Sequence, residues 1–146
     1  MASASNTSCP WLRKDVASPP TGWAAGGRAI AYVASVGYHE LYVNGAKVSA
    51  DVLSPSISDL AKRALVRPYD ISHHLQPGKP YTLGLWLGPG WSQFGSHTRL
   101  QASNIFNTTK APLVLATVRF YGGQDMELLG SVHTDASWKA HLSPIR

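Results

Sequence analysis

Residues 30–48 decide the fold that this chain can adopt, and they read Ile-Ala-Tyr-Val-Ala-Ser-Val-Gly-Tyr-His-Glu-Leu-Tyr-Val-Asn-Gly-Ala-Lys-Val. Up to Gly37 the side chains alternate with the period of two that a β-strand requires. One side of that strand holds Ile30, Tyr32, Ala34 and Val36. A second alternation follows and ends at Asn44-Gly45, a dipeptide typical of type I′ turns. The stretch therefore predicts a strand that leads into a β-hairpin.

The composition favours an all-β domain around this hairpin. The chain has 146 residues, of which 44% are hydrophobic and only 14% are charged, and it contains 13 Gly, 10 Pro and 5 Trp. Its length suits a single domain with one core. Few charges combined with many turn formers and aromatic residues are more typical of strands than of helices.

The rest of the chain supplies further strands separated by Gly and Pro turns. We expect strands at residues 81–87 and 113–121, a hairpin partner at 126–132 and a last short strand at 137–139. Residues 59–67 fit either one or two helical turns or a short strand, and residues 70–75 fit a single capped turn. The prediction is an antiparallel β-sandwich over residues 29–146. An extended arm rich in Pro, Gly and Ser precedes it at 1–28, with one short strand near Trp11.

Several short motifs follow one another in an order that is informative. They are the unit at 37–48, Val52-Leu53-Ser54-Pro55, Tyr69-Asp70-Ile71-Ser72, Leu75-Gln76-Pro77-Gly78, Leu87-Gly88-Pro89-Gly90-Trp91 and Thr134-Asp135-Ala136-Ser137-Trp138-Lys139. Together they resemble the N-terminal β-sandwich domain of bacterial-type α-L-rhamnosidases, a jelly roll of the galactose-binding-domain-like kind. The resemblance covers residues 9–145. It implies a non-catalytic carbohydrate-binding or accessory module for rhamnose-type glycans, joined in a longer polypeptide to a helical catalytic domain.

The chain also departs from that family pattern. Where the family has Pro-Gly-Trp-Thr-Asp-Tyr, this chain has Pro-Ser-Ile-Ser-Asp-Leu at residues 55–60, so two aromatic residues are absent. Aromatic faces pack against the apolar side of a sugar ring. The departure keeps open an alternative, a structural or assembly protein that has lost sugar binding. Such a protein is glycosylated and polymerises through exchange of a strand or of the arm at 1–28.

The candidate carbohydrate-binding residues lie in two loops. Trp91 follows a Gly-Pro-Gly turn and can stack on a sugar, or it can close the end of the sandwich instead. Gln93 belongs to the same polar loop. Asp59 and Arg63 can bind sugar hydroxyls, or they can be a helix-start carboxylate beside a solvated base.

The sequence indicates no catalytic residues. Glycoside hydrolysis requires two carboxyl groups that flank the scissile bond, and most of the 8 acidic residues fall in turns or at caps. No nucleophile, zinc or phosphate-loop motif occurs. We expect no cofactor, with Ca²⁺ as the one metal to consider, and its carboxylate ligands would be Asp51, Asp59 and Asp125.

The expected partners are a glycan or polysaccharide, with self-association under the alternative hypothesis. The net charge is +5, but basic residues do not cluster, so we expect no nucleic-acid partner. No apolar stretch approaches the ~20 residues of a membrane span, and the first residues lack the pattern of a signal peptide. Sequons at Asn6 and Asn107 predict N-glycosylation and therefore an extracellular or secreted protein.

Overall fold

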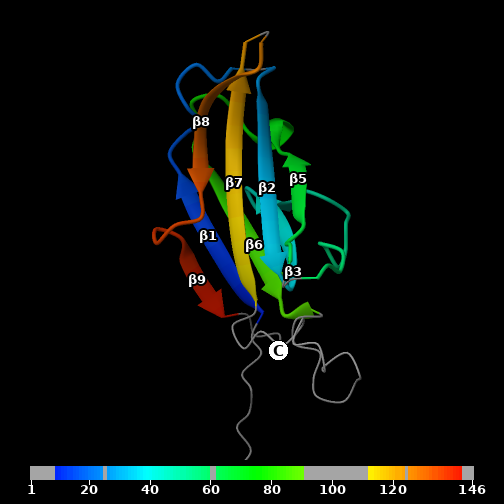
Figure 1. Ribbon diagram of the computed structural model, residues 1–146. Helices are drawn as coiled ribbons and strands as arrows, with labels where there is room; N and C mark the ends of the chain where they lie inside the picture. The colour runs from blue at the N-terminus through cyan, green and yellow to red at the C-terminus, as the bar shows by residue number, and fades with distance from the viewer. Residues whose placement is uncertain (1–8, 25, 60–61, 91–111, 124, 143–146) are drawn as a thin grey trace, which may run out of the picture.

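The computed structural model describes residues 9–24, 26–59, 62–90, 112–123 and 125–142. These residues form two antiparallel sheets that pack face to face (Figure 1). Sheet A has the strand order β4-β3-β6-β1-β9, and sheet B has the order β5-β2-β7-β8. The elements are β1 (Pro10–Val16), β2 (Arg28–Val36), β3 (Tyr38–Val43), β4 (Ala46–Lys47), β5 (Val66–Asp70), the 3₁₀ helix η1 (Ser72–His74), β6 (Tyr81–Gly88), β7 (Leu113–Gly122), β8 (Glu127–His133) and β9 (Lys139–Leu142). The predicted antiparallel β-sandwich is confirmed.

The stretch at 30–48 forms the strand and the hairpin that its sequence predicts. Asn44 and Gly45 both have positive φ, 52° and 82°, as a type I′ turn requires. Gly37 has a different role, because the chain passes there from sheet B into sheet A. Its φ is 100°, and a Cβ at this position would lie 2.3 Å from the Gly88 carbonyl oxygen. Only glycine fits this crossing.

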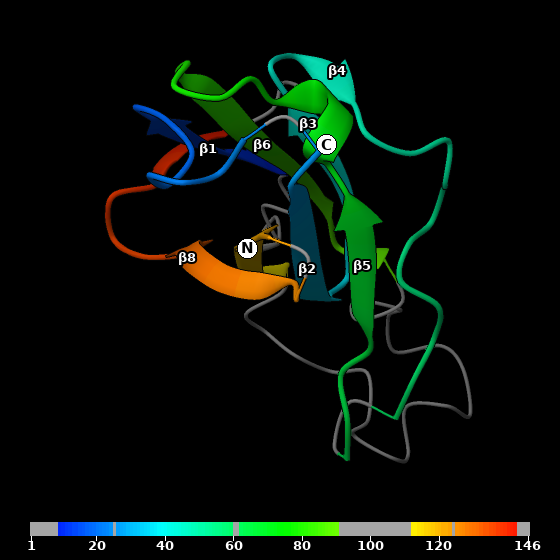
Figure 2. The ribbon, with the colours of Figure 1, turned by 90° about the horizontal axis from the view of Figure 1, so that it is seen from above.

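The core fills the space between the two sheets, which appear as separate layers from above (Figure 2). Four residues at alternate positions of β6 are buried, and they are Tyr81, Leu83, Leu85 and Leu87. On β2 the inner side carries the smaller residues Ala29, Ala31, Val33 and Ser35. The side with Ile30, Tyr32, Ala34 and Val36 therefore faces outward. Phe120 on β7 is fully buried and packs edge-on against Trp23.

The strand expected near Trp11 is β1, and it lies inside sheet A between β6 and β9. The short strand that was one of two alternatives within residues 59–67 is β5, which begins at Val66. Its Pro68 is tolerated because β5 is an edge strand. The last strand begins at Lys139, two residues later than expected, since Ser137 lies in a turn that Asp135 caps. In the described residues no helix has the length and hydropathy to span a membrane.

Candidate functional site

The loop residues that the sequence singled out are only partly described. Asp59 lies 3.3 Å from the Nζ of Lys62, and its carbonyl accepts the backbone N–H of Arg63. This local pairing does not test a role of Asp59 and Arg63 in sugar binding, which stays a prediction. Trp91, Gln93, Asn6 and Asn107 lie outside the described residues. A carbohydrate site in these loops therefore stays a prediction, as does glycosylation.

Two of the carboxylates considered for calcium are each paired with a basic residue. Asp51 forms an ion pair with Arg67, with Oδ2 2.5 Å from Nη2, whereas Asp59 pairs with Lys62. Across the described ranges, no three His, Cys, Asp or Glu side chains gather as a metal site would require. Calcium binding stays a prediction.

The structure assembles a different candidate site on the outer face of sheet A, and β6 lies at its centre. Gly84 pairs with Tyr42 of β3 on one side and with Arg13 of β1 on the other. Arg13 in turn pairs with Lys139 of β9. These four residues form one row across four strands. Tyr42 supplies an aromatic ring, Gly84 has no side chain, and the last two residues are cations. The missing side chain at Gly84 leaves a hollow in this row.

The neighbouring row is aromatic. Trp86 of β6 pairs with Trp11 of β1, and the two indoles stack with centroids 5.5 Å apart and planes within 3°. Trp11 also lies 5.1 Å from the ring of Tyr42, tilted by 55°. Beyond Trp11 the row ends at His141. The two indoles and the phenol therefore form one aromatic surface beside the Gly84 hollow.

The two rows enclose a groove of about 720 Å³, within the size range of small-molecule sites. We name it the sheet A groove. Its lining is Trp11, Leu12, Arg13, Tyr42, Asn44, Gly45, Thr82, Gly84, Lys139, Ala140 and His141. Such a surface offers flat apolar rings together with hydrogen-bond donors at its margin. The sequence alone did not indicate it, because its residues come from four strands and meet only through the sheet register.

Hydrogen bonds to neighbouring side chains fix the protonation states of three ionisable groups near the groove. Asp15 accepts hydrogen bonds from Arg13 and from Thr82, which together lower its pKa. Burial alone would raise the pKa of Glu40, but Lys47 and Tyr42 donate hydrogen bonds to it and lower the value. The same bond to Glu40 raises the pKa of the Tyr42 phenol to about 12. Tyr42 is therefore neutral, and both carboxylates are ionised near neutral pH.

A second polar cluster lies in the core at the end of β2. His39 is 2% exposed, and its Nδ1 is 2.8 Å from Ser35 Oγ and its Nε2 3.1 Å from Tyr69 Oη. Because Ser35 Oγ donates to the Gly37 carbonyl, we assign the imidazole proton to Nδ1, with Nε2 as the acceptor. Burial lowers the pKa of His39 to about 4. His39 is therefore a neutral residue of the core.

Comparison with known proteins identifies the family. The model of the family described as Alpha-L-rhamnosidase N-terminal domain matches residues 25–146. The chain belongs to this family. An α-L-rhamnosidase of Formosa agariphila is 29% identical over 117 residues, which is 78% of this chain and 12% of that protein. An α-L-rhamnosidase of Streptomyces avermitilis is 33% identical over 75 residues, 48% of this chain and 7% of the relative.

The same relation appears in solved structures. The crystal structure of the S. avermitilis α-L-rhamnosidase complexed with L-rhamnose has a TM-score of 0.73 and 25% identity to this chain. The match covers 95% of this chain and 12% of that one. The chain thus spans about a tenth of the length of the rhamnosidases it matches, and it corresponds to their N-terminal domain rather than to the whole enzyme.

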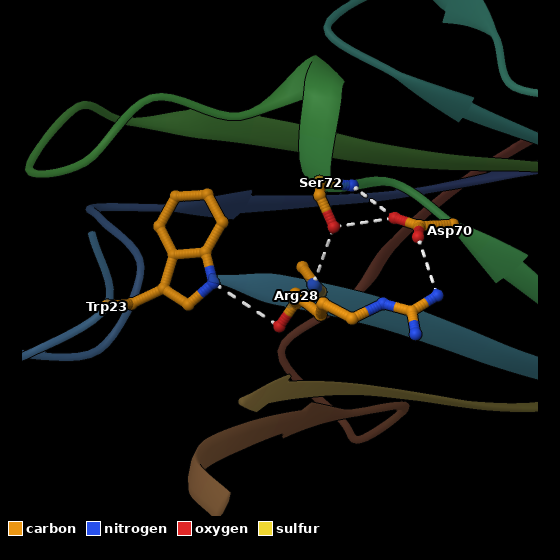
Figure 3. Close-up of polar contacts among 5 residues, drawn as sticks. Trp23, Arg28, Asp70 and Ser72 are labelled. Atoms are coloured by element: carbon orange, nitrogen blue, oxygen red, sulfur yellow. Dashed lines mark hydrogen bonds and ion pairs between the residues drawn. The ribbon is translucent and has the colours of Figure 1, made fainter. Parts of the chain in front are cut away.

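One of the motifs that carry the resemblance stabilises the fold of this rhamnosidase N-terminal domain. In the Tyr-Asp-Ile-Ser motif, Asp70 accepts the backbone N–H of Ser72 at 3.0 Å and pairs with Arg28 at 3.1 Å (Figure 3). Ser72 Oγ accepts the N–H of Ala29 at 2.8 Å, and the Trp23 indole donates to the Arg28 carbonyl at 3.3 Å. Burial raises the pKa of Asp70, but the Ser72 and Arg28 contacts outweigh it and lower the value. The motif ties β5 and η1 to the start of β2.

Proposed function

We propose that this α-L-rhamnosidase N-terminal domain is a non-catalytic carbohydrate-binding accessory module for rhamnose-type glycans. The observation that carries the proposal is the sheet A groove, where Trp11 and Tyr42 present aromatic faces beside the hollow at Gly84. A pyranose ring has an apolar face that packs on such rings and hydroxyls that bond to polar groups at the margin. The rhamnose complex of the S. avermitilis enzyme supports the choice of sugar.

A non-catalytic role agrees with the carboxyl groups. A glycosidase keeps one of its two carboxyl groups protonated at working pH. The described carboxylates with a displaced pKa are all displaced downward, and they are Asp15, Glu40, Asp51, Asp70 and Asp135. We propose that catalysis belongs to a helical domain of a longer polypeptide. The two sequons support an extracellular location.

The test is a titration of Trp fluorescence and heat of binding with L-rhamnose and rhamnose-containing oligosaccharides, with and without Ca²⁺. A valine at Gly84 would fill the hollow, and its Cβ would lie at an ordinary contact distance of 3.5 Å from Tyr42 Cβ. Gly88→Val is the matched control, because Gly88 lies on the same strand but outside the groove lining. A Cβ at Gly88 would lie 3.9 Å from its nearest neighbour, Tyr38 Cβ.

We expect saturable binding that Gly84→Val removes and Gly88→Val retains. Binding that survives Gly84→Val but is lost in Trp91→Ala would assign the sugar to the predicted loop site with Asp59, Arg63 and Gln93. Absence of binding at millimolar sugar in every protein would refute the proposed function.

The second candidate function is a self-associating structural protein. The observation that favours it is an apolar patch on the outer face of sheet B, where Leu115 is 66% exposed and Val66 is 57% exposed, both paired with Ala34. Exchange of the arm would require β1 to leave its place between β6 and β9. Light scattering after size exclusion at rising concentration tests this candidate: particles that grow with concentration, and shrink in Leu115→Ser, would support it, whereas a strict monomer would exclude it.

A further inference from the structure

We propose, building on the carbohydrate binding proposed above, that the sheet A groove takes an acidic oligosaccharide, with a uronic-acid carboxylate bound by Arg13 and Lys139. The ring that carries this carboxylate would lie over Gly84, against Trp11 and Tyr42. The proposal adds a ligand class to the groove, and it follows from how charge is distributed there.

The charged side chains that line the groove are Arg13 and Lys139, and both are basic. Arg13 and Lys139 are neighbours in the register of β1 and β9. Among the residues that the structure describes, they share a single acidic partner, since Asp15 Oδ1 is 2.8 Å from Arg13 Nη2 and Asp15 Oδ2 is 3.8 Å from Lys139 Nζ. Two cations on one carboxylate leave one positive charge without compensation at the margin of the groove.

The other acidic groups around the groove do not supply that missing charge. Glu40 lies in the aromatic row, but it already accepts hydrogen bonds from Lys47 at 2.5 Å and from Tyr42 at 2.6 Å. Asp135 is engaged by Ser137 and by Lys14, which is 3.7 Å from it. One exposed cation pair facing one aromatic wall therefore fits a ligand that combines a flat apolar ring face with a single negative charge.

A uronic acid has both features on one ring, with the carboxylate at the edge and an apolar face beneath it. A polyphosphate or nucleic acid fits less well, because repeated charges would need a cluster of basic residues rather than one surplus cation. Arg13 and Lys139 are 62% and 79% exposed, so both side chains can reach a bound carboxylate from the side of the groove opposite Tyr42.

The test compares one skeleton with and without its charge. An aldobiouronic acid, which is a disaccharide with one uronic acid, and its methyl ester are titrated into the full chain by isothermal calorimetry at low and high salt. We expect the acid to bind about tenfold more tightly than the ester, which is the effect of one partly exposed charge-assisted hydrogen bond. The preference should decrease as salt rises.

Variants separate the charge from the groove. Arg13→Gln and Lys139→Gln should each reduce the preference for the acid, whereas Asp15→Asn removes the shared partner and should tighten binding of the acid. Gly84→Val should abolish binding of both forms, and Gly88→Val should not. Circular dichroism of each variant confirms that it is folded.

Equal affinity for acid and ester, or an acid preference unchanged in Arg13→Gln and Lys139→Gln, would overturn the inference. If rhamnose oligosaccharides bind and their binding is lost in Gly84→Val while the aldobiouronic acid does not bind, the proposed function stands and the acidic ligand is refuted. If no saccharide binds, both are refuted.

Discussion

Replacement of His39 by glutamine should change how the stability of the protein depends on pH. The imidazole is 2% exposed, and it is neutral because burial lowers its pKa to about 4. Its Nε2 accepts a hydrogen bond from Tyr69, so a second proton on the ring would face a donor. Protonation of His39 is therefore disfavoured in the folded protein.

The size of the effect follows from the two pKa values of His39. In the unfolded chain the imidazole titrates near 6.5, and in the folded chain near 4. As the pH falls, the unfolded chain binds the proton before the folded protein does. The free energy of unfolding therefore decreases between about pH 6.5 and about pH 4, and His39 causes no further decrease below about pH 4. A difference of ~2.5 pH units corresponds to about 3 kcal/mol, at 1.36 kcal/mol for each unit.

The assay is urea unfolding of the wild type and of His39→Gln at intervals between pH 7.5 and 3.5. Glutamine lowers the free energy of unfolding at neutral pH, but it cannot be protonated in this pH range. The difference in free energy of unfolding between wild type and His39→Gln should therefore narrow by about 3 kcal/mol on acidification. The lowered pKa values of the carboxylates act in both proteins and cancel in the comparison. Tyr69→Phe is the control, because it removes a hydroxyl partner and keeps the imidazole. Parallel curves for wild type and His39→Gln would refute the buried, neutral histidine.

Three further predictions concern the fold. Phe120→Ala should lower the free energy of unfolding by about 3–5 kcal/mol, because it empties a fully buried site beside Trp23, and urea denaturation measures this. Gly37→Ala should prevent folding, since its Cβ would meet the Gly88 carbonyl, whereas Gly45→Ala adds no contact within 4 Å and should cost only about 1–2 kcal/mol for its positive φ; circular dichroism separates them. Asp70→Asn should cost about 1 kcal/mol at neutral pH. Because folding lowers the Asp70 pKa from 3.8, the wild-type advantage is present above that value and should vanish in unfolding curves as the pH falls below it.

Much of the fold could be predicted from local patterns. Alternation on 81–87 marks the buried side of β6 because the side chains of a strand must point to opposite faces. Asn44-Gly45 marks the turn between β3 and β4 because both residues must take positive φ. His39 is also visible in this way, since it falls in phase with Leu41 and Val43, the buried side of β3. The position of His39 in the alternation of β3 predicts its burial better than the general preference of histidine for protein surfaces does.

Local patterns fail where both faces of a strand are apolar. On β2 the side with Ile30 and Tyr32 has the larger residues, yet the side with Ala29 and Ala31 faces the core. Small residues fit there because Phe120 of β7 and Tyr81 of β6 fill the space between the sheets, with ring centroids 6.2 Å apart. Which side of β2 is buried thus depends on the bulk of strands distant in sequence.

The sequence by itself determined most of the strands and their turns, because alternation, Asn-Gly and capping motifs act over a few residues. The order of its short motifs also indicated the family to which the chain belongs. Only the tertiary structure decided that β1 is a central strand and that Tyr42, Gly84, Arg13 and Lys139 share one row. Sheet order and register are set by contacts between segments far apart in the chain. The candidate groove exists only through that register, so no segment of the sequence contains it.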